Sequence, residues 1–205
     1  FEKETPNFLI DLFLNAPKIK NLSFQYIEHL PTNLCQLESL KTLRIFESCI
    51  SELPTNFTNL KNLEDFFIGS RVFKSLPHDI TKMTSLKYIA IYSSEIEYLP
   101  ENIFNMPTLK RITITDAYIK TLPESKLWEN TNFDYENFGH IYLDFSNNLI
   151  TELPQSFKYL KYARVDLQGN PLIVSSELQD IIDTMRTNEC EVELDEEIEE
   201  LLNER

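Results

Sequence analysis

The amino-acid sequence predicts an α/β fold: a curved solenoid of short stacked units, with parallel strands on the concave side and helical turns on the convex side. The first observation is a Leu-Pro dipeptide that recurs at spacings of 23, 23, 23, 23 and 31 residues. The second is a set of apolar positions that keep one register after each dipeptide. The third is composition, since 42% of the 205 residues are hydrophobic and can form a core. The six leucines are Leu30, Leu53, Leu76, Leu99, Leu122 and Leu153.

Each unit combines two apolar periods. Residues 43–45 (Leu-Arg-Ile) alternate apolar and polar, as a half-buried strand does. Leu34, Leu37 and Leu40 recur every third residue, which indicates a helical or 3₁₀ turn with one side inward. Neither half can bury its apolar side alone, so the units must stack. Because strands pack about 4.8 Å apart and helices about 8–10 Å apart, the stack curves with its sheet inside.

A small polar residue follows each Leu-Pro proline by two positions. Proline presets φ where the chain enters the helical side, and a small polar side chain there can accept a bond from a nearby backbone N–H. We therefore expect these residues to cap the helical turns. They are Asn33, Asn56, Asp79, Asn102, Ser125 and Ser156.

The repeated pattern LPxxIxxLxxLxxLxLxxNxIxx resembles the leucine-rich repeat, in its 23-residue intracellular and bacterial subclass. The resemblance covers roughly residues 21–172 and implies a horseshoe shape and protein binding. The family's asparagine, which ties one turn to the next, is present only at Asn148 and Asn170. Elsewhere we expect looser loops, and we expect Arg71 to point outward because an unpaired buried guanidinium is too costly. The other positions hold Ser48, Arg71, Ser94 and Ala117.

Three regions are expected. Residues 1–20 form an N-terminal cap with a helix over 5–15, and residues 21–174 form the solenoid, with an insertion within 124–140 that carries Trp128, Phe133, Tyr135 and Phe138. Residues 175–205 form a C-terminal cap. There we expect a helix over 176–187, an edge strand within 190–194, and an acidic helix over 196–204 capped by Asp195.

Charge and motifs restrict the function. A net charge of −14 argues against nucleic acid as the main partner, and no apolar run is long enough to span a membrane. His29, His78 and His140 fit no metal pattern, and three cysteines form no disulfide framework. Asp144 and Asp166 lie on neighbouring strands, but an open sheet desolvates them too little for acid–base catalysis. We expect no enzyme activity, no cofactor and no metal.

The outward positions of the concave sheet are the predicted binding site. Aromatic side chains with flanking arginines are typical of interface hot spots. The alternative is that these aromatics only pair across strands. The proposed partner-binding residues are Arg44, Phe46, Phe67, Tyr88, Tyr92, Arg111, Thr113 and Tyr142. Trp128, in the convex insertion, is a second candidate, with packing against the convex face as its alternative.

The sequence thus predicts a non-catalytic module, monomeric, that recognises a protein or peptide on its concave sheet. Two alternatives remain open: the targeting domain of a larger enzyme or bacterial effector, and a surface adhesin that binds host protein or glycan. We expect a soluble chain, either cytoplasmic or secreted with a signal removed before Phe1. The sequence leaves the partner, the source organism and the compartment open.

Overall fold

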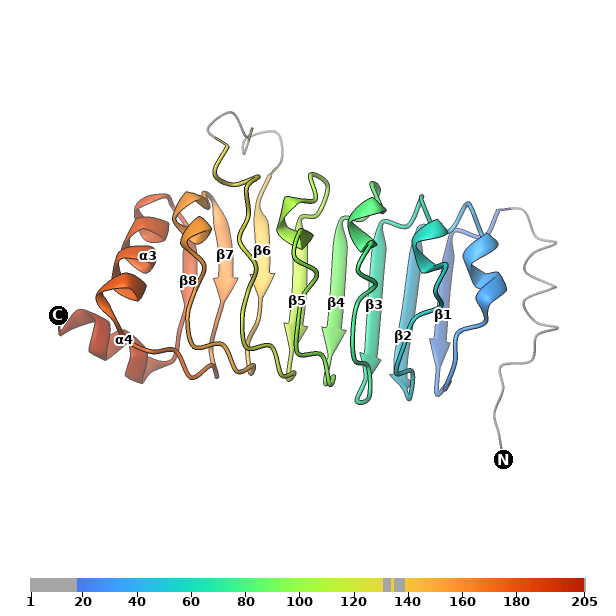
Figure 1. Ribbon diagram of the computed structural model, residues 1–205, viewed down its shortest axis with the longest axis horizontal. Coiled ribbons are helices and arrows are strands. Elements are labelled where there is room, and N and C mark those ends of the chain that lie inside the picture. Colours follow the sequence, from blue (N-terminus) through green and yellow to red (C-terminus); the bar gives the residue numbers. More distant parts are fainter. Residues whose placement is uncertain (1–17, 131–133, 135–138, 205) are drawn as a thin grey trace.

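The computed structural model describes residues 18–130, 134 and 139–204. In this part of the chain eight strands form one parallel sheet, and each strand pairs with the next along the sequence. Figure 1 shows the strands in chain order, with the two long helices at the C-terminal end. The strands are β1 (Asn21–Gln25), β2 (Thr42–Ser48), β3 (Asp65–Ser70), β4 (Tyr88–Tyr92), β5 (Arg111–Thr115), β6 (Ile141–Asp144), β7 (Ala163–Asp166) and β8 (Glu191–Glu193).

Short 3₁₀ turns form the wall opposite the sheet. In five of the six Leu-Pro dipeptides the proline opens a described turn, because the Pro carbonyl accepts from the N–H three residues on, as from Phe57 to Pro54 at 2.9 Å. The expected curved α/β solenoid is confirmed. The described turns are η1 (Thr32–Gln36), η2 (Phe57–Asn59), η3 (Ile80–Lys82), η4 (Ile103–Asn105) and η5 (Gln155–Tyr159), followed by helices α3 (Ser176–Thr187) and α4 (Glu196–Asn203).

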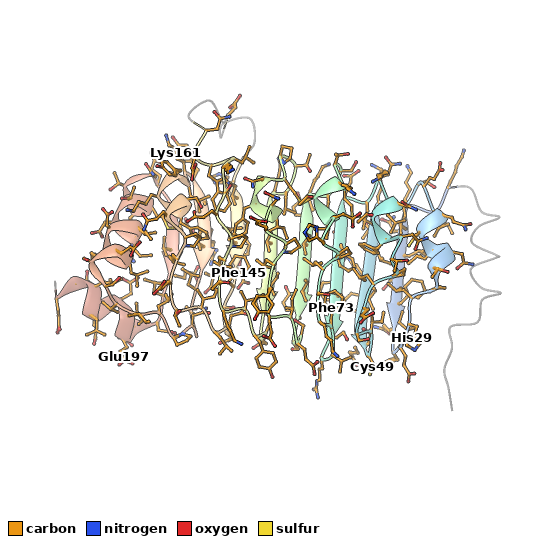
Figure 2. All side chains as sticks on the ribbon, viewed as in Figure 1. His29, Cys49, Phe73, Phe145, Lys161 and Glu197 are labelled. Carbon is orange, nitrogen blue, oxygen red and sulfur yellow. The ribbon has the colours of Figure 1, made fainter. Side chains whose placement is uncertain are left out.

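The inward strand positions form one continuous core. Leu43, Ile45, Ile89 and Ile91 are all 0% exposed, so the register predicted from the alternation is correct. Strand partners across β2 to β5 lie 23 residues apart, as Leu43 pairs with Phe66, except at the end of β2. In Figure 2 the core side chain Phe145 lies in the middle of the stack, whereas Lys161 lies at one edge and Cys49 at the other.

Most units leave their strand through one residue in the left-handed region. This conformation turns the chain sharply away from the sheet. In the unit after β7 the residue is Gly169, where a Cβ would lie 2.2 Å from the Asn147 Oδ1, so only glycine fits there. The residues with positive φ are Glu47, near the end of β2, and, after β1, β4, β5, β6 and β7, Tyr26, Ser93, Asp116, Asn147 and Gly169.

The third unit differs because β2 carries one extra residue. The register between β2 and β3 shifts after Ile45, so that Ser48 pairs with Ser70. Ser70, and not Arg71 as the sequence register suggested, therefore takes the buried position, and its Oγ donates to the Ile50 carbonyl at 2.8 Å. Arg71 is exposed, as expected.

The two asparagines of the pattern tie neighbouring units together. The Asn148 Nδ2 donates to the Ile114 carbonyl at 2.7 Å, and its Oδ1 accepts from the Ile119 N–H at 3.1 Å. Asn170 repeats the arrangement with the Phe145 carbonyl and the Ile150 N–H. Buried backbone groups of one unit are thus satisfied by the amide of the next.

The expected capping role of the six small polar residues is wrong for most of them. No side chain caps η1 to η5. Several bond to the neighbouring unit instead: the Asn56 Nδ2 donates to the Thr32 carbonyl, and the Ser156 Oγ accepts from the Ser125 N–H. Ser125 accepts from a backbone N–H of its own turn, that of Trp128, at 3.3 Å. In the stacked repeats the side chains of Asn56 and Ser156 therefore bond to the backbone of the neighbouring unit rather than to the backbone of their own turn.

The C-terminal elements follow the prediction in order and bounds. Helix α3 buries Leu178, Ile181, Ile182 and Met185, and β8 pairs with β7 in parallel. The expected capping of α4 by Asp195 is wrong, because its carboxylate accepts from the Gly169 N–H at 3.0 Å and makes no cap bond. Asp195 thus joins the last repeat to the C-terminal elements.

Trp128 is a core residue. It is 5% exposed, its ring stacks on Phe104 with centroids 4.8 Å apart, and it meets Phe157 edge-on at 5.4 Å. The convex candidate site is therefore wrong, and the alternative of packing against the stack holds. The expected helix over 5–15 and the insert residues Phe133, Tyr135 and Phe138 lie outside the described residues.

Asn148→Ala should lower the free energy of unfolding by about 1–3 kcal/mol, because it leaves buried backbone groups unpaired. Urea unfolding followed by circular dichroism measures the change. Ser94→Ala is the matched control at the same register position, since the buried Ser94 Oγ has no partner among the described residues and its removal should cost nothing. Equal losses in the two variants would contradict the role given to the asparagine.

Candidate functional site

The concave sheet carries an open depression of about 430 Å³ across β2 to β5, called here the aromatic hollow. Parallel pairing sets outward side chains of neighbouring strands beside one another, so residues far apart in sequence meet. It contains six of the eight predicted partner-binding residues. The hollow is lined by Arg44, Phe46, Asp65, Phe66, Phe67, Tyr88, Ile89, Ala90, Tyr92 and Arg111.

Three aromatic rings form one wall of the hollow. The Phe67 ring lies 4.6 Å from the ring of Phe46 and 5.3 Å from that of Tyr92, in tilted contacts. A Cβ added at Gly69, the strand partner of Tyr92, would lie 3.8 Å from the Phe67 ring, in ordinary contact. The rings are half-buried, so cross-strand pairing accounts for part of their placement.

Tyr88 stands apart from this ladder. It pairs with Asp65 on one side and Arg111 on the other, and its side chain is 42% exposed. Within the described residues its ring contacts no other aromatic ring. Ala90 lies between Tyr88 and Tyr92 on the same face. Because its side chain is small, it does not fill the hollow between them.

The two predicted arginines have different surroundings. Arg44 forms an ion pair with Asp65 at 3.0 Å. The guanidinium carbon of Arg111 lies 4.3 Å from the centroid of the Tyr142 ring, a cation–π contact, and its Nε donates to the Thr113 Oγ1 at 3.3 Å. Thr113 is only 1% exposed, so its predicted role as a partner contact is wrong: it holds Arg111 instead.

The lysines where the strands begin are neutralised locally. Lys41 and Lys87 both donate to the Glu64 carboxylate. These hydrogen bonds, first from Lys41 and then from Lys87, lower the pKa of Glu64 to about 2. The pairing leaves these two lysines less available to a ligand.

An acidic row continues the concave face towards the C-terminal end. Asp144, Asp166 and Glu193 occupy one register position on β6, β7 and β8. Burial raises the pKa of Asp166, and the like charges of Asp144 and Glu193 raise it further, against a bond accepted from the Gln168 N–H. Arg164 forms an ion pair with Glu193, so Asp144 and Asp166 are the members of the row that have no ion pair among the described residues.

A second depression, of about 450 Å³, lies where β2 to β4 end. Tyr92 lines both depressions, so the two share a wall. Arg71, Glu47 and the exposed Cys49 line this one, together with Val72. The depression extends the apolar surface beyond the predicted residues.

The remaining histidines and cysteines do not come together in a second site among the described residues. His140 is exposed, and its Nδ1 lies 3.0 Å from the Tyr162 carbonyl oxygen. Cys35 and Cys190 are buried free thiols, and burial raises the pKa of Cys35 to about 11. Across residues 18–130, 134 and 139–204, no cluster of three metal-ligating side chains occurs, and no helix is both long and apolar enough to cross a membrane.

Sequence reasoning missed the hollow itself. It identified the outward aromatics but gave no role to Ala90, the small residue that lines the hollow between Tyr88 and Tyr92. The signal was present, because a small residue at an outward position beside four aromatics leaves a gap in an otherwise filled face. The acidic row could also be predicted by aligning Glu193 with Asp144 and Asp166.

Comparison with solved structures shows the fold. The leucine-rich repeat domain of the type III effector XopL superposes with a TM-score of 0.64 at 15% identity, over 93% of this chain and 73% of that one. An internalin of Listeria monocytogenes gives 0.65 at 16% identity, over 90% and 52%. A leucine-rich repeat protein of Leptospira interrogans gives 0.50 at 18%, over 89% and 56%.

The fold is therefore a leucine-rich-repeat solenoid. The chain spans little more than half the length of the Leptospira and Listeria proteins to which it is similar. No protein-family model and no curated protein sequence matches it. At these identities the likeness concerns the fold alone.

Asp144→Asn should lower the pKa of Asp166 towards its ordinary value, because it removes one of the like charges that raise it. Carboxyl chemical shifts followed by NMR through an acid titration measure the pKa. Glu152→Gln, an exposed change outside the acidic row, should leave it unmoved. An unshifted pKa of Asp166 in the Asp144 variant would show that the Asp144 charge does not contribute to it.

Proposed function

We propose that this protein is a non-catalytic recognition module that binds a protein or peptide through the aromatic hollow. The observation that carries the proposal is Tyr88, a large aromatic side chain that is 42% exposed on the floor of an open sheet. Interface hot spots are enriched in tyrosine, tryptophan and arginine, and they lie in concave, desolvated settings.

Cross-strand pairing explains only part of the surface. Phe46, Phe67 and Tyr92 gain about 0.5–1.5 kcal/mol per ring pair from one another. Tyr88 has no such ring contact among the described residues, so folding gives no reason for an aromatic there. A partner side chain that enters the hollow could cover Tyr88 and Ala90 together.

The proposal extends to the organisation of the chain. We place the repeats in the 23-residue subclass, supported by the 23-residue offsets of strand partners from β2 to β5. Residues 21–174 act as the binding solenoid, with residues 1–20 and 175–205 as caps at its ends. The proposed module works as a monomer.

Tyr88→Ala should weaken binding by about 2 kcal/mol while leaving the melting temperature nearly unchanged, because Tyr88 acts in the contact and not in the core. The probe is a peptide selected from a random phage-displayed library on the wild-type chain, and fluorescence anisotropy measures its Kd.

Tyr118→Ala is the matched control for this experiment. Tyr118 is 52% exposed but lies outside the residues that line the hollow, so its loss should leave the Kd unchanged. Selected peptides that bind the Tyr88 variant as tightly as the wild type would place the binding surface elsewhere. Phe67→Ala serves less well as a test, because it also removes two ring contacts.

A further inference from the structure

Arg111 differs from the other cations around the aromatic hollow. Arg44 is paired with Asp65, Arg164 with Glu193, and both Lys41 and Lys87 with Glu64. None of the ion pairs found in the described part of the chain includes Arg111, although its side chain is exposed and lines the hollow. A guanidinium without a carboxylate partner is thus left at the edge of the site.

The surroundings of Arg111 hold it in one orientation. Tyr142 covers a face of the guanidinium at 4.3 Å, and Thr113 accepts from Nε at 3.3 Å. Stacking and one hydrogen bond leave the other N–H donors of the planar group without a partner from the described residues. A donor group that is already oriented loses less conformational entropy when it binds an acceptor.

We propose that the partner is a protein segment in which a large apolar side chain stands next to an aspartate or glutamate. The apolar side chain fills the hollow over Ala90 and Tyr88, and the carboxylate pairs with the Arg111 guanidinium. This inference rests on the proposed function and specifies the chemistry of its partner. Bidentate pairing with a carboxylate suits the planar fork of arginine.

The neighbouring charges favour a singly charged carboxylate. Asp65 lines the hollow on the side of β3 but is paired with Arg44, whereas Asp144, beside Thr113 on β6, is in none of the ion pairs of the described residues. One unpaired guanidinium balances one negative charge, whereas a doubly charged phosphate would bring a second charge near Asp144. The acidic row of Asp144, Asp166 and Glu193 also disfavours a second acidic residue where the segment crosses β6 and β7.

The test uses the same phage-selected peptides and two variants of the full chain. The selected peptides should carry an acidic residue within a few positions of an aromatic or large aliphatic one. Arg111→Gln should raise their Kd about tenfold or more, because a charge-assisted bond is lost. Arg164→Gln, the matched control, removes an already paired concave arginine and should change the Kd by less than about twofold.

A peptide in which the acidic residue is replaced by its amide completes the experiment. It should lose the same factor on the wild-type chain and no longer distinguish wild type from Arg111→Gln. Far-UV circular dichroism checks that both exposed-site variants remain folded.

The outcomes separate the two proposals. Peptides that require Tyr88 but bind Arg111→Gln unchanged, or that carry no acidic residue, would overturn the carboxylate anchor and leave the aromatic hollow as the binding site. Peptides indifferent to both Tyr88→Ala and Arg111→Gln, or a library that yields no binders, would count against both proposals.

Discussion

The burial of one unit's apolar side chains against those of the next is the interaction on which the rest of the structure depends. A single strand and its 3₁₀ turn cannot remove Leu43 or Ile45 from water, but the stacked units leave both 0% exposed. The stacking sets the parallel register, and the register decides which side chains share the concave face. Each surface feature described above therefore depends on contacts between residues 21 or more positions apart.

The outward face is free of this constraint, which is why it can carry a site. Inward positions must be apolar and of similar size, whereas outward positions need only tolerate a strand. At those positions the chain places four aromatics around the small Ala90, a combination that packing does not require. The same freedom leaves Arg111 without an ion pair in the described part of the chain while Arg44 and Arg164 are paired.

Polar groups inside the stack are satisfied between units more often than within them. Asn148, Asn170 and Ser156 bond to the backbone of a neighbouring unit, and Ser70 replaces an asparagine where a bulge in β2 shifts the register. Asp195 makes a bond of the same kind at the C-terminal end, where its carboxylate accepts from the Gly169 N–H. These cross-unit bonds, added to apolar burial, resist sliding of one unit over another.

The sequence by itself determined the repeat, the strand faces, and the bounds of the C-terminal helix and strand, because period-two and period-three patterns are local. It also placed Phe46, Phe67, Tyr88 and Arg111 on one surface. Only the tertiary structure decided that Thr113 and Trp128 are buried, that Ser70 replaces Arg71, and that Asp195 bonds across units. Those outcomes depend on which side chains and backbone groups of the adjacent unit lie next to each position. A local sequence pattern does not predict these contacts between units.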